Sequence, residues 1–221
     1  MLVLASNSPR RRQLISLGGW EPTLISTIVD ESTFPSERAE AYVRRLAEMK
    51  ARAACTIIRQ ENLSGSLVIG ADTAVVSGDE ILGKPADADE AWRMLQNLRG
   101  RMHQVFTAVA VLNLATDELS GEVCVTDVPM RDYSNEEVQK YIDSGDPFDK
   151  AGAYAIQHPV FKPAQDLHGC YANVMGMPLC HLTRLLASYS VHPEGDIAQA
   201  CQATINYTCP VFQQILSGEM A

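Results

Sequence analysis

Residues 66–76, Ser66-Leu-Val-Ile-Gly-Ala-Asp-Thr-Ala-Val-Val76, decide the fold of this chain. A nearly continuous apolar run of this length is typical of a strand buried on both faces of a sheet. Asp72 stands in the middle of the run, beside the small residues Gly70 and Ala71, which leave room for a close neighbour. An unpaired buried carboxylate is costly by several kcal/mol. We therefore expect Asp72 to hold a cation or a metal.

Strand and helix patterns alternate on both sides of this run. A serine cap followed by a proline, Ser8-Pro9, predicts a helix start, and Ser134-Asn-Glu-Glu137 is a capping box. Further strands are predicted at 2–5, 23–28, 80–82, 103–114, 122–131 and 170–175. Helices are predicted at 37–59 with Ser36 as the cap, 88–98, 134–143 and 179–188. This alternation predicts an α/β fold with a mixed central sheet and flanking helices.

Length, charge and composition exclude several classes of protein. The 221 residues suffice for one domain or two small lobes, and the net charge of −9 argues against binding polymeric nucleic acid. No apolar stretch is long enough for a bilayer span, and the start of the chain does not read as a signal peptide. The six cysteines lack the close spacing of a zinc site. Because the sequence shows no export signal, we expect their thiols to be reduced.

The segment Ser6-Asn-Ser-Pro-Arg-Arg11 joins a strand to a helix start. Free backbone N–H groups and the positive end of the helix dipole favour an anion there. Arg10 and Arg11 lie in the first turn, where cations are unfavourable unless an anionic ligand compensates them. The alternative is a solvated basic turn with an ordinary serine cap.

Lys50 lies on the apolar face of the helix predicted at 37–59. An inward lysine indicates a buried anion nearby. The alternative is a lysine at the edge of the stripe that reaches water through its long side chain.

Three further segments offer polar groups. Asp30-Glu31 follows an apolar strand and, with Asp72, could supply carboxylates to a hard divalent cation such as magnesium. The turn Gly83-Lys84-Pro85 places a lysine where it could meet a phosphate. Residues 149–157 combine small residues with an amide, Gln157, that is able to read a base edge. Each of these segments alone is also compatible with an ordinary loop.

The ordered set of motifs resembles the Maf family of nucleotide pyrophosphatases. The matching strings are Leu4-Ala-Ser-Asn-Ser-Pro-Arg-Arg11, Arg45-Leu-Ala-Glu-Met-Lys50, Gly70-Ala-Asp-Thr73, Gly83-Lys-Pro85, Asp149-Lys-Ala-Gly152 through Gln157, and Asn173-Val-Met-Gly-Met-Pro178. The resemblance covers roughly residues 2 to 188. It implies two lobes around a nucleotide-binding cleft, a cytoplasmic location and a divalent metal, magnesium or manganese. A homodimer is kept open as the assembly.

The resemblance also implies an activity: hydrolysis of a nucleoside triphosphate to the monophosphate and pyrophosphate, which removes unwanted or modified nucleotides. Asp72 is then the general base and a metal ligand with Glu31. The substrate-binding residues are Ser6, Ser8, Arg10, Arg11, Lys50 and Lys84. The combination of Arg10, Thr73 and Gln157 is similar to the branch that hydrolyses dTTP and UTP.

Two other functions stay open at this stage. One is a nucleotide-sensing regulator of cell division without turnover, and the other is a pyrophosphatase for damaged purine nucleotides. We divide the chain into a domain of residues 1–190 and a C-terminal extension, 191–221, of unassigned role. The extension is expected to be irregular with one short helix, to dock on the domain or on a partner subunit, and to be dispensable for catalysis.

Overall fold

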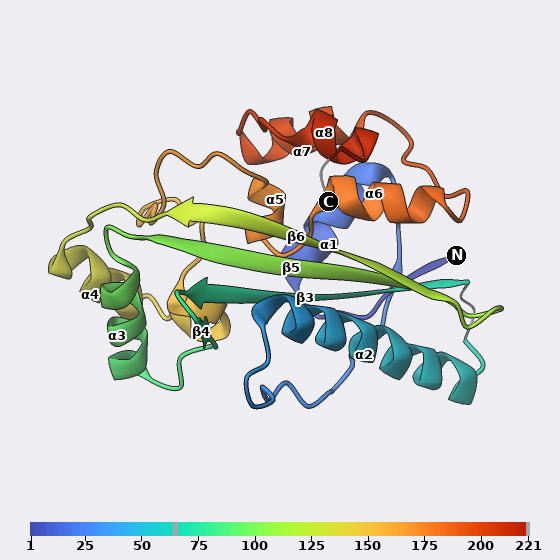
Figure 1. Ribbon diagram of the computed structural model, residues 1–221, viewed down its shortest axis with the longest axis horizontal. Helices are drawn as coiled ribbons and strands as arrows, with labels where there is room; N and C mark the ends of the chain where they lie inside the picture. The colour runs from blue at the N-terminus through green and yellow to red at the C-terminus, as the bar shows by residue number, and fades with distance from the viewer. Residues whose placement is uncertain (64–65, 220–221) are drawn as a thin grey trace.

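A computed structural model describes residues 1–63 and 66–219 of the chain. Its centre is a mixed six-stranded sheet in the order β2-β1-β3-β5-β6, with β4 paired to β3 (Figure 1). The strands are β1 (Leu2–Leu4), β2 (Thr23–Leu24), β3 (Leu67–Ser77), β4 (Glu80–Leu82), β5 (Met102–Asn113) and β6 (Leu119–Pro129). The first three spatial neighbours, β2, β1 and β3, are parallel, whereas β3, β5 and β6 are antiparallel. The predicted α/β class and mixed sheet are confirmed.

The strand β3 is much longer than its neighbour β1. The first part of β3, Leu67–Ile69, pairs with β1. A tight turn follows β3, and β4 then runs back antiparallel to it and pairs with Val75–Ser77. Between them, no strand in the described part of the chain pairs with Gly70–Ala74 on this side of β3, while β5 pairs with them on the other. The backbone around Asp72 thus lies at an interruption of the sheet edge, where a ligand can approach.

One face of the sheet is covered by the long helix α2 (Ala39–Gln60), which lies below β3 and β5 in Figure 1. Most of the apolar stripe predicted for this helix is buried, including Val43, Leu46 and Ala54, whereas Ala53 and Ile57 are half-buried at its edge. Gly70 of β3 allows the close approach, because a Cβ at that position would lie 2.0 Å from the carbonyl oxygen of Ala47. This contact sets α2 directly against the strand that carries Asp72.

The opposite face carries the main hydrophobic core. It is covered by α1 (Pro9–Ile15), α5 (Tyr171–Val174), α6 (Leu179–Ala187), α7 (Ile197–Ile205) and α8 (Phe212–Ser217), and Figure 1 shows these helices on the other side of the sheet from α2. The helices α3 (Ala88–Leu98) and α4 (Asn135–Asp143) pack together beyond the end of the sheet where β5 begins. As predicted, Ser134 and Glu137 form the capping box of α4.

Three local predictions are wrong. Residues 170–175 are not a strand but contain the short helix α5. The strand predicted at 23–28 is limited to Thr23–Leu24. Ser36 does not cap α2, because its φ of 59° places it in a left-handed turn, and the N-cap is Arg38 without a side-chain cap.

The C-terminal extension is more regular than predicted, because it forms two helices, α7 and α8. It packs on the domain: Ile197 and Cys201 belong to the main core cluster. The indole nitrogen of Trp20 donates a hydrogen bond to the carbonyl oxygen of His192 (3.2 Å), and the Tyr207 hydroxyl donates one to the carbonyl oxygen of Leu167 (3.0 Å). None of the helices in the described residues is long and apolar enough to cross a membrane.

Candidate active site

A cavity with a volume of about 660 Å³ opens beside the interruption of the sheet edge. Its lining comes from the end of β1 and the start of α1, from α2, β3 and the turn after β4, and from the segments 149–157 and 174–176. Of the candidate site residues named in the sequence analysis, the following line this cavity: Ser6, Ser8, Arg10, Arg11, Glu31, Lys50, Asp72, Thr73, Lys84 and Gln157. Asp30 does not line it, because its carboxylate accepts a hydrogen bond from the Ser32 N–H in an exposed turn (2.9 Å). Segments as far apart in sequence as residues 6 and 157 are therefore brought to one place.

Asp72 and Glu31 converge on one ammonium group. The Lys50 Nζ lies 2.6 Å from an Asp72 carboxylate oxygen and 2.6 Å from a Glu31 carboxylate oxygen. Only 10% of the Asp72 side chain and 12% of the Lys50 side chain are exposed, against 49% for Glu31. Lys50 therefore points inward, and the alternative of a lysine that reaches water at the edge of the stripe is wrong. The buried carboxylate meets a cation, as its position in an apolar strand predicted.

The two carboxylates titrate differently because they are buried to different depths. Burial raises the pKa of Asp72, and the nearby charges of Lys50 and Arg11 offset only part of this effect. Burial also acts to raise the pKa of Glu31, but the hydrogen bond to Lys50 and the charges of Lys50, Lys84 and Arg11 together outweigh it, so this pKa lies below the usual value. Burial acts in the same sense on both carboxylates, but only Asp72 has a pKa above its ordinary value.

The donor set fits a hard divalent cation that is only partly held by protein. The point that the Asp72 and Glu31 carboxylates share is held by the Lys50 ammonium group, 2.6 Å from each, so a divalent cation there would take the place of that contact. Magnesium is commonly bound by one or two carboxylates together with water and phosphate oxygens. Within residues 1–63 and 66–219, no group of three or more His, Cys, Asp or Glu side chains is arranged to hold a metal. Substrate oxygens and water would have to supply the remaining ligands.

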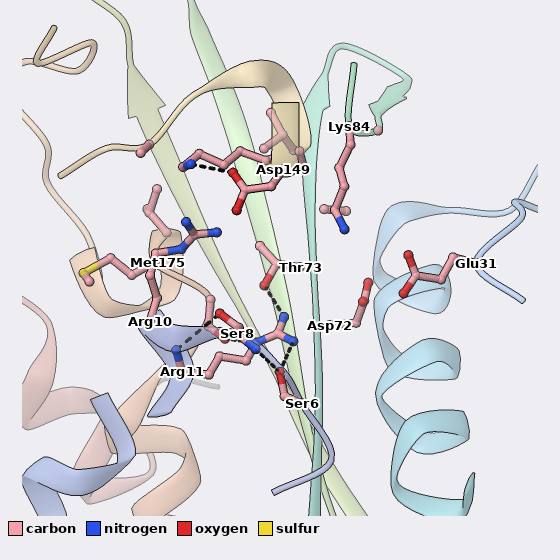
Figure 2. A pocket seen from close by; sticks show the side chains of 18 of the residues that line it. Ser6, Ser8, Arg10, Arg11, Glu31, Asp72, Thr73, Lys84, Asp149 and Met175 are labelled. Carbon is pink, nitrogen blue, oxygen red and sulfur yellow. Dashed lines mark hydrogen bonds and ion pairs between the residues drawn. The ribbon is translucent and has the colours of Figure 1, made fainter. Parts of the chain in front are cut away.

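Arg11 lies at the floor of the cavity and is held by three protein oxygens. Its Nε donates to the Gly176 carbonyl oxygen (2.9 Å), and its two terminal nitrogens donate to the hydroxyls of Ser6 (3.3 Å) and Thr73 (3.1 Å). Figure 2 shows the guanidinium between Ser6 and Thr73. The Ser8 hydroxyl caps α1 by accepting from the Arg11 backbone N–H (3.4 Å).

The remaining predicted site residues lie around the upper cavity. In Figure 2 Lys84 extends from the turn after β4 toward the side of Asp72 and Glu31, whereas Arg10 lies on the other side of β3. Gln157 is exposed on the segment that follows Ile156. Two clusters of groups therefore face the cavity: the Asp72–Lys50–Glu31 cluster on the α2 side of β3, and Arg11 with Thr73 on the α1 side.

Three contributions to the cavity were missed as individual residues. Tyr42 of α2 lines it, and burial, with the Asp72 charge, raises the pKa of its hydroxyl to about 12. Lys150 is buried and pairs with Asp149 (2.6 Å), which also lines the cavity. Gly176 has a φ of +99°, and a Cβ there would lie 3.1 Å from the Thr73 hydroxyl oxygen. The 149–157 and 173–178 motifs pointed to these last two segments but not to their partners.

Comparison with known proteins places the chain in a family. The family described as Maf-like protein matches residues 1–189. The chain belongs to the Maf family. Two relatives carry the name dTTP/UTP pyrophosphatase. The one from Hahella chejuensis is 43% identical over 190 residues, which cover 86% of this chain and 92% of that protein. The one from Pseudoalteromonas atlantica is 42% identical over 196 residues, which cover 88% of this chain and 100% of that protein.

A third relative of the same name, from Chromobacterium violaceum, is 42% identical over 188 residues, covering 85% of this chain and 94% of that protein. The predicted resemblance to the Maf family is therefore confirmed. The match to the family ends at residue 189, just before the extension that forms α7 and α8.

Proposed function

We propose that this Maf-family nucleoside triphosphate pyrophosphatase acts on dTTP and UTP, and releases the nucleoside monophosphate and pyrophosphate. The choice of these two nucleotides is supported by the relatives that carry the name dTTP/UTP pyrophosphatase at 42–43% identity. The observation that carries the proposal is the position of Asp72: a buried carboxylate with a raised pKa at the wall of a cavity lined by the cations Arg10, Arg11, Lys50 and Lys84.

The cations account for the binding of an anionic substrate by a protein of net charge −9. Phosphoryl transfer depends mainly on positioning and on neutralisation of the phosphate charge. Arg11 is fixed by three acceptors and, of its five N–H groups, two remain for a ligand. We assign phosphate contacts to Arg10, Arg11 and Lys84, and to the hydroxyls of Ser6 and Ser8 that lie beside them.

Asp72 would act as the general base. A carboxylate with a raised pKa is a better proton acceptor than an ordinary aspartate. Asp72 accepts a proton from a water molecule, and the oxygen of that water attacks the α phosphorus. The bond from the α phosphorus to the oxygen that bridges the α and β phosphates breaks, so pyrophosphate leaves and the monophosphate remains. Lys50 holds the carboxylate in place through its 2.6 Å contact.

Asp72 and Glu31 are the residues that would hold a divalent cation, magnesium or manganese. When bound, such an ion supplies charge neutralisation of the phosphate oxygens. The ammonium group of Lys50 lies between the two carboxylates, so it keeps them together without a metal and prevents their mutual repulsion.

The choice of base is assigned to Arg10, Thr73 and Gln157. The amide nitrogen of Gln157 can donate to a ring carbonyl oxygen of thymine or uracil. Two lobes around the cleft, a cytoplasmic location and a homodimer stay predictions.

A substrate panel tests the proposal. The purified protein with magnesium or manganese is incubated with the common and modified nucleoside triphosphates, and monophosphate, pyrophosphate and orthophosphate are quantified separately. We expect dTTP and UTP to be the best substrates and pyrophosphate to be the leaving product. Orthophosphate with a nucleoside diphosphate would contradict the reaction, and binding without turnover would support the sensing alternative. Faster hydrolysis of purine triphosphates would contradict the proposed substrate.

A further inference from the structure

We propose that Thr107 is a positioning residue: it orients the Thr73 hydroxyl so that this hydroxyl can only accept hydrogen bonds from the cavity. An acceptor at this position favours a base with a ring N–H donor, thymine or uracil, over cytosine. The proposal rests on the proposed function for the identity of the substrate. It concerns residues on β3, β5 and α5 that form one chain of hydrogen bonds behind Arg11.

The direction of this chain is determined at its buried end. The Thr107 hydroxyl lies 2.9 Å from the carbonyl oxygen of Asn173 and 3.0 Å from the hydroxyl of Thr73. The Asn173 carbonyl oxygen can only accept, and it also accepts from the Gly176 N–H (2.8 Å). Both hydroxyl contacts contain a proton only if Thr107 donates to Asn173 and Thr73 donates to Thr107, because any other arrangement leaves two oxygens facing each other without a proton. Thr107 therefore meets Thr73 with a lone pair, and the Thr73 hydroxyl must donate its own proton inward.

Thr73 is then left with lone pairs alone on its outer side. One of them accepts from the Arg11 guanidinium at 3.1 Å. Thr73 is half-buried and lines the cavity, so its remaining lone pair is available to a ligand. A phosphate oxygen cannot satisfy it, because that oxygen is itself an acceptor. A ring N–H group can, and thymine and uracil carry one at the ring position where cytosine has an acceptor.

The buried end cannot easily change direction. Thr107 and Asn173 are both fully buried. The Asn173 side-chain amide donates to the carbonyl oxygen of Val105 (3.0 Å) and to the hydroxyl of Thr126 (2.8 Å), which fixes α5 against β5 and β6. The Asn173 carbonyl oxygen has two lone pairs, one for the Gly176 N–H and one for the Thr107 hydroxyl, so Thr107 keeps its direction and Thr73 donates toward it.

Thr107 does not line the cavity. It acts through Thr73, and its replacement should change discrimination between bases rather than phosphate binding. The matched variants are Thr107→Val, which keeps the shape and removes the hydroxyl, and Thr107→Ser, which keeps the hydroxyl. With valine at this position the Thr73 proton is released and can be donated to a ligand acceptor, such as the ring nitrogen of cytosine.

The test measures the dissociation constants of non-hydrolysable α,β-imido analogues of dTTP, dCTP and N3-methyl-dTTP by calorimetry. We expect the wild-type protein to bind the dTTP analogue about tenfold more tightly than either of the others, the size of one lost hydrogen bond. Thr107→Val should bring the dTTP/dCTP ratio to about one, while Thr107→Ser keeps it within about twofold.

An unchanged ratio in folded Thr107→Val, with only a lower melting temperature, overturns the proposal and leaves Thr107 a structural role. Equal binding of dTTP and N3-methyl-dTTP by the wild type also overturns it. If Thr107→Val does not fold, Thr73→Val tests the same point, because it removes the acceptor itself. It should likewise bring the ratio of the dTTP and dCTP analogue affinities close to one. Since only binding is measured, a wild type that discriminates but does not hydrolyse would contradict the proposed function alone.

Discussion

At the scale of the residue, the proposed chemistry depends on Asp72. Asp72 as a whole residue is 7% exposed, and its carboxylate would be expensive to ionise alone. Lys50 provides the compensating charge at 2.6 Å, and Glu31 shares the same ammonium group. The result is a carboxylate whose pKa is raised but which keeps a charged partner, a combination suited to accepting a proton.

We expect Asp72→Asn to lower kcat by about 10²- to 10⁴-fold, the usual contribution of a general base, with little change in the binding of nucleotide. Asparagine keeps the volume and removes the charge. Steady-state kinetics and calorimetry with a non-hydrolysable analogue measure the two effects. Asp127→Asn is the matched control, because Asp127 is an exposed strand aspartate that lies outside the cavity. Near-wild-type turnover of Asp72→Asn would remove Asp72 from the mechanism.

At the scale of the element, the position of α2 on β3 decides whether Lys50 reaches Asp72. The two elements are in direct contact at Gly70, where an added Cβ would lie 2.0 Å from the Ala47 carbonyl oxygen and 2.9 Å from the Ala51 nitrogen. Both contacts are with backbone, which cannot rotate away as a side chain can. The helix would have to shift as a body, and Lys50 would move with it.

Gly70→Ala should therefore lower the free energy of unfolding by about 1–3 kcal/mol or more, as expected for overpacking of a tight core. Chemical denaturation of wild type and variant gives this difference. Gly83→Ala is the control, because nothing lies within 4 Å of a Cβ added there, and it should leave the unfolding midpoint unchanged. Equal stability of the two variants would show that α2 and β3 can separate without loss.

At the scale of the whole molecule, stability depends on groups far from the cavity. Two buried histidines, His103 and His181, each have a pKa lowered to about 4 by burial. The nitrogens of His181 have no hydrogen-bond partner in the described residues. In the unfolded chain both side chains titrate near 6.5. Below that pH the unfolded chain binds protons that the folded protein does not.

The free energy of unfolding that the two neutral histidines contribute is complete above pH 6.5 and is lost as the pH falls toward about 4. Each histidine accounts for on the order of 3 kcal/mol of this loss. His181→Leu should remove roughly half of this acid sensitivity. Melting temperatures between pH 7.5 and 5 check it, with the exposed His168→Leu as the control. A variant with the same pH dependence as wild type would contradict the assignment.

The C-terminal extension also acts on the whole molecule. It buries Ile197 and Ile215, and no residue after Gly176 lines the cavity in the described part of the chain. Truncation after Val191 should lower the free energy of unfolding by about 3–6 kcal/mol, from the loss of the two buried isoleucines, and leave turnover per folded molecule unchanged. Denaturant unfolding and specific activity measure both. A well-folded but inactive truncation would show that the extension reaches the cleft.

The sequence by itself determined the elements whose signal is local. The apolar run of β3, the capping box of α4 and the stripe of α2 depend on residues within a few positions of each other, and all three formed as predicted. The sequence also indicated that Asp72 needs a cation or a metal and that an inward Lys50 needs an anion, because a charge in an apolar environment needs a partner. Only the structure shows that these two residues are each other's partner.

Only the tertiary structure shows where contacts between residues far apart in the sequence override the secondary structure that the local sequence favours. Residues 170–175 favour a strand, yet α5 forms because the Asn173 side chain finds acceptors on β5 and β6, and the Cys170 sulfur accepts from the Asn173 N–H at 3.4 Å. The polarity of Thr73 likewise depends on Thr107, which is 34 positions away along the chain. A hydrogen bond between strands has no periodic trace in the sequence, so these contacts exist only once the sheet has brought them together.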